Sequence, residues 1–394
     1  MSFKFLSYQY EGGVAEFHYQ GKDGREFVEK ARFFDPGIDY DKGMLDRALR
    51  LALIILGTSY YKAEPVNQVE LPFAIGADEA KFFDKIYQEG MSQFAYENNL
   101  TRESLAHFVA GSTTEVVENQ RALEPGILVL LSGGKDSLLT AEKVRESGVN
   151  FRVCYITAQQ DYPAILNEFG EPILIRREID KEGLLAVGGM NGHVPVTLIN
   201  EALALIQVIL IGFNRVELGV GREGLEPHAY AGDLPVNHQW SKTKEAQDLF
   251  KNYVRKYISG GIMIGSLLEN MNELEIAEEF AEKCWEKYGE KFSSCNVANY
   301  KQGEDNRALK WCGKCAKCAN SYLLFCPYVA FSEQEKIFGR DLFLDPEMTE
   351  IFKGLLGIDG VMKPFECVAS IGELRWAYHH RLSGYGELPF EVPE

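Results

Sequence analysis

The sequence is poor in basic residues and in cysteine. Its 41 lysines and arginines are outnumbered by 58 aspartates and glutamates, which gives a formal net charge of −17 and a pI near 5.0. Proteins that bind nucleic acid non-specifically need a basic face, so this class is disfavoured. The apolar runs at 51–56 and 202–211 are too short to span a bilayer, and the N-terminus lacks the apolar core of a signal peptide. We therefore expect a cytoplasmic protein that binds neither nucleic acid nor membranes.

The eight cysteines are too few for a disulfide scaffold in a chain of 394 residues. Cys312, Cys315 and Cys318 follow a Cys-x-x-Cys-x-x-Cys pattern, and Cys295 lies upstream. In a reducing cytoplasm, four such thiolates can close a tetrahedral zinc site. An iron–sulfur cluster and free or redox-active thiols are the alternatives.

The first part of the chain, residues 1–122, is predicted to be an α+β N-terminal domain. Apolar and polar residues alternate over 2–10 and 14–20 around a Glu-Gly-Gly turn, which predicts a β-hairpin. Residues 44–56 have helical character, and Gly57 is a plausible stop for that helix. No catalytic motif is identified in this part of the sequence.

The pattern then changes to strands that alternate with helices. Apolar strands are predicted at 127–131, 151–157, 171–178 and 215–221. This alternation predicts an α/β domain with a doubly wound parallel sheet over residues 123–290. Residues 291–394 then form a Cys-rich C-terminal region.

The most informative motif lies between the first of these strands and the following helix. It consists of Ser132, Gly133, Gly134, Lys135, Asp136 and Ser137. The two glycines let the backbone turn sharply and approach an anion, and the amides at the helix start face that anion. The lysine and the two hydroxyls add donors, while the aspartate suits a bridging Mg²⁺ ion. An ordinary turn between a strand and a helix needs neither the lysine nor the aspartate.

Two further polar segments are candidate ligand contacts. His193 precedes a long apolar helix and either faces a substrate or belongs to a helix start that Thr197 caps. Arg222 follows the fourth strand at the same edge of the sheet, where it faces an anionic ligand or is a solvated loop charge.

Two more segments concentrate polar groups nearer the C-terminus. Residues 234–243 contain Asn237, His238 and Lys242, a density of hydrogen-bonding groups more typical of a functional loop. Residues 363–368 hold Glu366 and Cys367, which either serve the site or flank residues that pack.

The Ser-Gly-Gly-Lys-Asp-Ser motif resembles the PP-loop of the ATP pyrophosphatase superfamily, whose fold is adenine-nucleotide α-hydrolase-like. In that superfamily the loop holds the pyrophosphate of ATP while a substrate oxygen attacks the α-phosphorus. The resemblance therefore implies that residues 132–137 bind ATP with Mg²⁺, with Asp136 as a metal ligand. The cysteine pattern is also similar to the zinc site of a PP-loop nitrile synthase.

Several segments taken in order resemble one family within that superfamily. They are LGTSYYK (56–62), GMSQFAYENNL (90–100), NGHVPVT (191–197), VNHQWSK (236–242), SSCN (293–296), WCGKCAKC (311–318) and KPFECV (363–368). The resemblance is to MurL, a family of ATP-dependent epimerases of peptidoglycan precursor synthesis. It implies a small-molecule substrate, UDP-MurNAc-L-Ala-L-Glu, whose terminal L-Glu becomes D-Glu with release of AMP and pyrophosphate.

Such a reaction needs an activated carboxylate and a base. An acyl-adenylate on the α-carboxylate makes the neighbouring proton acidic, and a side chain then removes it. The candidate catalytic groups are His193, His238, Glu366 and Cys367, with His238 favoured because neutral imidazole exchanges protons near pH 7.

Charge and hydrogen bonding for an acidic substrate would come from nearby polar side chains. We expect Arg222, Asn237 and Lys242 to bind the substrate, with local positive charge offsetting the acidic surface.

Two other functions stay open from the sequence. One is a different PP-loop enzyme that adenylates a nucleobase or tRNA before sulfur or nitrogen attack, with the cysteines as sulfur carriers. The other is a non-catalytic nucleotide-binding module. Release of pyrophosphate separates both enzymes from the module, and zinc content separates the epimerase from a thiol carrier.

Overall fold

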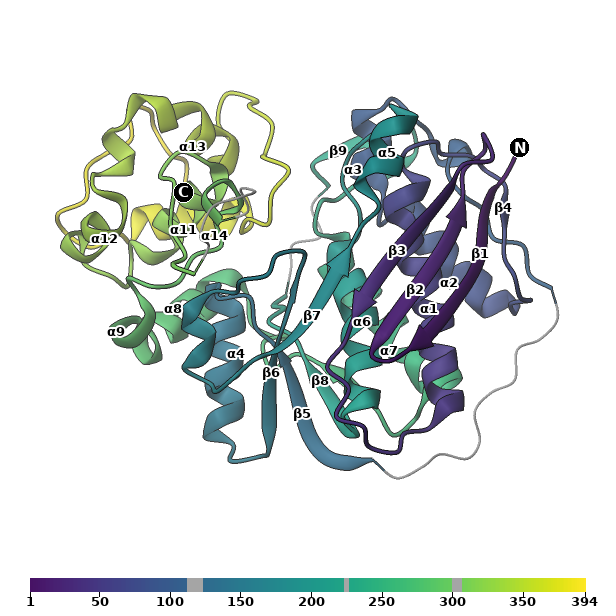
Figure 1. Cartoon of the computed structure of the whole chain (residues 1–394). Coiled ribbons are helices and arrows are strands. Elements are labelled where there is room, and N and C mark those ends of the chain that lie inside the picture. The colour runs from purple at the N-terminus through teal and green to yellow at the C-terminus, as the bar shows by residue number, and fades with distance from the viewer. Residues whose placement is uncertain (112–122, 223–226, 300–306) are drawn as a thin grey trace.

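The central feature of the computed structural model, which describes residues 1–111, 123–222, 227–299 and 307–394, is a nine-stranded sheet (Figure 1). The strand order is β11-β8-β5-β6-β7-β3-β2-β1-β4. The strands are β1 (Phe3–Glu11), β2 (Val14–Gln20), β3 (Glu26–Arg32), β4 (Val69–Glu70), β5 (Glu124–Leu130), β6 (Phe151–Thr157), β7 (Ile173–Glu178), β8 (Phe213–Glu217) and β11 (Met263–Gly265). A separate small hairpin pairs β9 (Ala229–Ala231) with β10 (Leu234–Val236).

The strands β11, β8, β5, β6 and β7 are parallel. The chain runs from β5 outward through β6 to β7, then crosses back to β8 on the other side of β5. The direction of winding therefore reverses between β5 and β8, and α/β sheets bind ligands at the carboxyl ends of strands at such a point. The mixed α/β class and the four predicted parallel strands are confirmed.

Both faces of the parallel strands are covered by helices. On one face α6 (Val196–Leu210) packs on β5 and β8, with α1 (Lys42–Tyr61) beside it over β1 and β2. On the other face α4 (Lys135–Glu146) packs on β5 and β6, and α8 (Glu273–Lys283) packs on α4 (Figure 1). Leu128 of β5 belongs to the first core, whereas its neighbours Ile127 and Val129 belong to the second. Burial on both faces explains why the strand is an uninterrupted apolar run.

The N-terminal strands extend this sheet. β1, β2 and β3 form an antiparallel meander, and β3 pairs antiparallel with β7, so that Ala31 lies opposite Arg177. The sequence places residues 1–122 and 123–290 in separate domains, whereas in the structure they share one sheet and one core. Residue 122 itself lies outside the described residues.

Gly57 does not end the first long helix, contrary to the sequence prediction. Helix α1 continues to Tyr61, and Gly57 is buried within it. A Cβ atom at position 57 would lie 2.5 Å from Cε1 of Phe5 and 2.9 Å from the hydroxyl of Tyr87. The glycine therefore allows close packing of α1 against β1 and α2 (Ala77–Gln88), and has no role as a helix stop.

The remaining helices flank the sheet or form the C-terminal region. Those in the first part are α2 (Ala77–Gln88), α3 (Ser92–Glu97), α5 (Lys181–Val187) and α7 (Lys244–Tyr253). Those that follow α8 are α9 (Trp285–Tyr288), α10 (Asn296–Asn299), α11 (Ala316–Phe325), α12 (Phe331–Phe338), α13 (Thr349–Leu356) and α14 (Ile371–His379). The C-terminal helices share the second core with α4 and α8, which ties them to the sheet.

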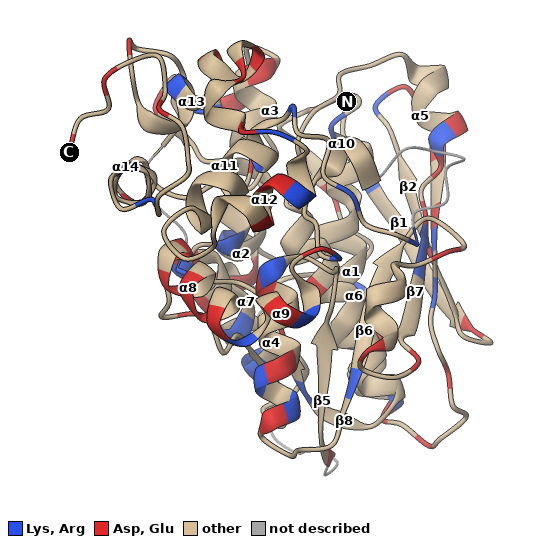
Figure 2. Ribbon diagram, turned by 90° about the vertical axis from the view of Figure 1, so that its left-hand side faces the viewer, with Lys and Arg blue, Asp and Glu red and all other residues tan. Residues whose placement is uncertain are grey.

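Charged residues cluster on the outer helices. Figure 2 shows acidic and basic residues interspersed along α4, α8 and α9. Glu279 of α8, for example, lies 2.5 Å from Lys143 of α4 and 2.6 Å from Lys283. Within the described ranges, no helix combines the length and apolar character needed to cross a membrane.

Candidate active site

A cavity of about 650 Å³ lies at the carboxyl edge of the parallel strands. Its wall includes the ends of β5, β6, β7 and β8 and the start of α6. The C-terminal region closes the wall with residues next to the cysteine cluster and with Cys367. The cavity thus lies at the reversal of strand winding, where the fold is expected to bind a ligand.

The Ser-Gly-Gly-Lys-Asp-Ser loop forms one side of this cavity. Helix α4 begins at Lys135, and its N-cap residue, Gly134, has no side chain that could occupy the helix end. Gly133 has a φ of +87°, which favours glycine. The Ser132 amide donates to Oγ of Ser137 over 3.2 Å, which closes the turn. The start of α4 is therefore directed at the cavity and suited to an anion such as phosphate.

Lys135 lies between two carboxylates in this wall. Its Nζ is 2.5 Å from Oδ1 of Asp136 and 2.5 Å from Oε2 of Glu273, the first residue of α8. Burial alone would lower the pKa of Lys135, but the two carboxylates more than offset it and the pKa is raised. Lys135, Asp136 and Glu273 all line the cavity. No local sequence pattern indicates Glu273, because it lies far from the motif along the chain.

Two predicted histidines meet in the cavity wall. The ring centroids of His193 and His238 are 4.4 Å apart, and both residues line the cavity. Burial, with smaller effects of neighbouring charges, lowers the pKa of His193 to about 3 and that of His238 to about 4. Both imidazoles are consequently neutral at pH 7, the form that accepts a proton.

The loop that carries His193 faces the cavity. Helix α6 begins at Val196 with Pro195 as its N-cap, so Thr197 does not cap it as one reading of the sequence supposed. Thr197 instead lines the cavity with His193. The substrate-facing alternative is therefore favoured by this geometry.

The N-terminal part of the chain holds both histidines in place. Oε1 of Gln93, a residue of α3, lies 2.5 Å from Nδ1 of His238. Asn98, which follows α3, donates its amide to the carbonyl of Asn191, two residues before His193. Sequence reasoning found no site role for this part. The only signal was the family resemblance of residues 90–100.

The other predicted residues fall in different places. Cys367 and Lys242 line the cavity, and Glu366 lies beside it with Oε2 3.8 Å from Nζ of Lys317. Asn237 lines a separate recess of about 210 Å³, and its side chain accepts a hydrogen bond from a backbone amide two residues along. Arg222 is exposed and is not among the residues that line the cavity. The substrate roles of Asn237 and Arg222 stay predictions.

Two cations of the cavity wall were missed by sequence reasoning. Lys317 lies between Cys315 and Cys318 in the sequence, and Arg177 is the penultimate residue of β7. Nε of Arg177 is 2.6 Å from Oε1 of Glu29, a fully buried carboxylate of β3. Only the pairing of β3 with β7 brings these groups together, so no local pattern could indicate them.

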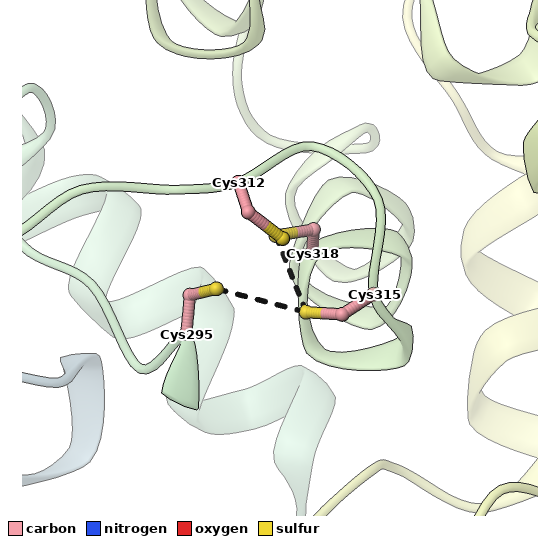
Figure 3. A group of neighbouring side chains, drawn as sticks. All are labelled: Cys295, Cys312, Cys315 and Cys318. Carbon is pink, nitrogen blue, oxygen red and sulfur yellow. Dashed lines mark hydrogen bonds between the residues drawn. The ribbon is translucent and has the colours of Figure 1, made fainter. Parts of the chain in front are cut away.

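The four predicted cysteines form a compact cluster (Figure 3). The Sγ atoms of Cys295 and Cys315 are 3.7 Å apart, those of Cys315 and Cys318 3.6 Å, and those of Cys312 and Cys318 3.7 Å. All four ligand atoms lie within 4.8 Å of one another. Hydrogen bonds from Cys315 and Cys318 lower the pKa of the Cys295 thiol, which favours a thiolate. The cluster could therefore hold a metal ion.

Together, the fold and the cavity define an α/β protein with a helix start suited to an anion and neutral histidines at the switch point of its sheet. The model of the MurL N-terminal domain matches residues 1–267, and that of the MurL C-terminal domain matches residues 291–383. The chain belongs to the MurL family. This division places no boundary near residue 122, in agreement with one sheet that contains strands from both sides of that position.

Three curated relatives are similar over most of their length. A protein of Xanthomonas oryzae pv. oryzae is 33% identical, covering 93% of this chain and 82% of the relative. Proteins of Micromonospora sp. and Salinispora tropica are 32% and 31% identical, covering 94% of this chain and 85% and 83% of the relatives. All three are named UDP-N-acetyl-alpha-D-muramoyl-L-alanyl-L-glutamate epimerase.

Proposed function

We propose that this chain is an ATP-dependent epimerase that converts the terminal L-Glu of UDP-MurNAc-L-Ala-L-Glu to D-Glu, with release of AMP and pyrophosphate. The names of the relatives support the substrate. The observation that carries the proposal is that a helix start suited to phosphate and a pair of neutral histidines face one cavity. Activation and proton transfer can then act on the same bound molecule.

The loop of residues 132–137 would bind the phosphates of ATP through the amides of α4 and the charge of Lys135. Asp136 and Glu273 fit a Mg²⁺ ion because they are two carboxylates in one cavity wall, and Mg²⁺ prefers oxygen ligands. When bound, Mg²⁺ would neutralise phosphate charge. Lys135 keeps these two carboxylates close together.

Activation of the α-carboxylate explains why an epimerase would consume ATP. Removal of the α-proton next to a free carboxylate would place two negative charges on adjacent atoms. In an acyl-adenylate that carboxylate is neutralised, and its carbonyl accepts the electron pair of the broken C–H bond. Return of a proton on the opposite face gives D-Glu, and water then cleaves the anhydride to release AMP.

His238 is the candidate base. It is neutral because its pKa is lowered by burial, and it lines the cavity with His193. The proton that returns to the opposite face of the α-carbon would come from another group of the cavity wall. Cys367 and His193 are the candidates for this acid. Lys242, Lys317 and Arg177 would supply positive charge for the acidic substrate.

The metal that we propose for the cysteine cluster is a structural zinc ion. With Zn–S bonds of about 2.3 Å, a tetrahedral site separates its sulfurs by about 3.8 Å. The observed separations of 3.6 and 3.7 Å fit that geometry. The sulfurs lie too close together to enclose several iron atoms. A zinc ion would fix Asn296 and Lys317, which are adjacent to ligands and line the cavity.

The decisive experiment incubates the full chain with Mg·ATP and UDP-MurNAc-L-Ala-L-Glu. Pyrophosphate is measured, and the glutamate of the hydrolysed product is analysed on a chiral column. We expect pyrophosphate together with D-Glu. Pyrophosphate without D-Glu would support another adenylating enzyme, and bound ATP without pyrophosphate would point to a different substrate or to a nucleotide-binding module.

A further inference from the structure

The side chain of Gln93 links a carboxylate to the candidate base. Its Nε2 donates to Oε1 of Glu97 over 2.7 Å, and its Oε1 lies 2.5 Å from Nδ1 of His238. Gln93 and Glu97 are four residues apart on α3, and Gln93 is only 7% exposed. The three side chains thus form a continuous hydrogen-bonded row from the protein surface to the cavity wall.

The carboxylate sets the orientation of the Gln93 amide. A carboxylate of Glu97 only accepts hydrogen bonds, so the amide nitrogen must face it. The opposite orientation would place two acceptor oxygens 2.7 Å apart. With the nitrogen held by Glu97, the amide oxygen is directed at His238.

The amide oxygen in turn sets the tautomer of His238. An amide oxygen only accepts, so Nδ1 of the imidazole must carry the hydrogen. In a neutral ring the other nitrogen, Nε2, then holds the lone pair. Nε2 is therefore the atom of His238 that can take a proton from a substrate.

We propose that Glu97 and Gln93 are positioning residues that fix His238 in its Nδ1–H tautomer, so that Nε2 acts as the base of the epimerisation. This inference rests on the proposed function and deepens it. In water the two tautomers interconvert, so without the row only part of the enzyme would present a basic Nε2. The row also gives the short helix α3 a part in the chemistry.

Other charged and titratable groups also act on His238. The nearby groups are His193, His228, Lys242, Lys317, Glu366 and Glu97, which come from six different segments. Burial has a larger effect than any of these charges and keeps the ring neutral, with a pKa of about 4. Neutrality provides a lone pair, and the row determines which nitrogen carries it.

The tautomer can be observed directly by NMR on the full chain with ¹⁵N-labelled histidine. The chain has seven histidines, and the signals of His238 are assigned by their loss in His238→Gln. We expect a protonated Nδ1 and an unprotonated Nε2. In Gln93→Met, which has nearly the same shape without an acceptor, the two shifts should approach each other as the tautomers mix. A wild-type His238 protonated at Nε2 would overturn the proposal.

The kinetic test is exchange of the substrate α-proton in D₂O with Mg·ATP. In Gln93→Met we expect kcat for exchange to fall by about two- to tenfold, in step with the lost fraction of the Nδ1–H tautomer, which is less than the 10²–10⁴-fold effect of losing a whole general base. KM for ATP should not change. Mixed tautomers with an unchanged kcat would overturn the positioning role.

Variants at Glu97 provide a second test on an exposed residue. Glu97→Leu removes the acceptor that orients Gln93 and should mix the tautomers and slow exchange. Glu97→Gln can donate as well as accept, so it should restore the tautomer and the rate only in part. Gln9→Met is the matched control, since it removes a 2.7 Å glutamine–carboxylate hydrogen bond with Glu16 in the N-terminal hairpin.

The two proposals fail in different ways. If the wild-type chain releases pyrophosphate but neither exchanges the α-proton nor inverts the α-carbon, the proposed function is wrong. The catalytic role of the row from Glu97 to His238 is then wrong as well. If the wild type epimerises while Gln93→Met keeps the wild-type tautomer and rate, only the row is wrong.

Discussion

At the scale of single residues, the environment of the histidines matters more than their identity. His18 lies half-buried in β2, away from the cavity, whereas His193 and His238 lie half-buried in the cavity wall with their ring centroids 4.4 Å apart. Burial penalises the charged imidazole, and nearby lysines add to that penalty at His238. The cavity therefore holds bases that stay unprotonated at neutral pH.

Replacement of His238 should separate the two halves of the reaction. In His238→Gln we expect D-Glu formation to fall about 10²–10⁴-fold, the usual contribution of a general base. Pyrophosphate release should persist, because activation of the carboxylate does not need the base. The measurement is chiral analysis of glutamate alongside a pyrophosphate assay, and His18→Gln is the control. Full epimerisation by His238→Gln would remove this residue from the mechanism.

The pH dependence should report the lowered pKa of His238. The base is neutral above its pKa of about 4, so activity is present above that value and lost as the pH falls through it. An unperturbed histidine would lose activity below about pH 6.5. We expect kcat/KM to stay level from pH 8 down to about pH 5.5, where more than nine-tenths of such a base is still neutral. An acid limb near pH 6.5 would contradict the assignment, and circular dichroism would check that the chain stays folded.

At the scale of elements, a glycine marks the closest approach of helix α1 to the N-terminal sheet. Leu53 in the same helix accepts a hydrogen bond from the hydroxyl of Tyr19 in β2, so α1 meets the sheet through both packing and polar contacts. The interface fixes the end of α1, where Lys62 donates to the carbonyl of Gly192 beside His193. Packing at Gly57 is therefore connected to the position of the site.

Substitution of Gly57 by alanine should destabilise the protein, although alanine is usually the better helix former. The added Cβ would lie 2.5 Å from Phe5, and overpacking of this kind costs about 1–3 kcal/mol of the free energy of unfolding. Urea denaturation measures the effect. Gly372→Ala in α14 is the control, because no atom lies within 4 Å of its Cβ and stability should be unchanged or higher by up to about 1 kcal/mol. Equal stabilities of the two variants would contradict the packing argument.

At the scale of the whole molecule, the cavity is assembled from parts far apart in the sequence. The N-terminal region supplies the support from α3 and Glu29, the parallel strands supply the loop and Arg177, and the C-terminal region supplies Lys317 and Cys367. The cysteine cluster lies next to Lys317 of the C-terminal region. Its metal should therefore affect both stability and activity.

Removal of zinc should weaken the fold and the reaction together. We expect one zinc ion per chain by elemental analysis, and loss of that ion in Cys312→Ser. A site occupied at 100 times its Kd stabilises the native state by about 2.7 kcal/mol, so thermal unfolding should occur at a lower temperature in the variant. Cys284→Ala, which changes a buried core thiol outside the cluster, should keep its zinc. A zinc-free wild type with full activity would contradict this prediction.

The sequence by itself determined the features that depend on short stretches of chain. The parallel strands appear as apolar runs because both their faces are buried, the family is carried by ordered motifs, and the cysteine cluster follows from a two-residue spacing. The Ser-Gly-Gly-Lys-Asp-Ser loop was predicted with its position at the edge of the sheet, because the carboxyl end of a parallel strand is where a helix must begin.

Only the tertiary structure decided what meets across the cavity. Glu273 reaches Lys135, Gln93 reaches His238, and Arg177 reaches Glu29 through pairings that no local pattern encodes. The same reason explains two differences from prediction, since Gly57 is a packing residue and the N-terminal strands join the main sheet. Hydrophobic patterning fixes which face of an element is buried, but contacts between distant elements depend on how those faces are matched in three dimensions.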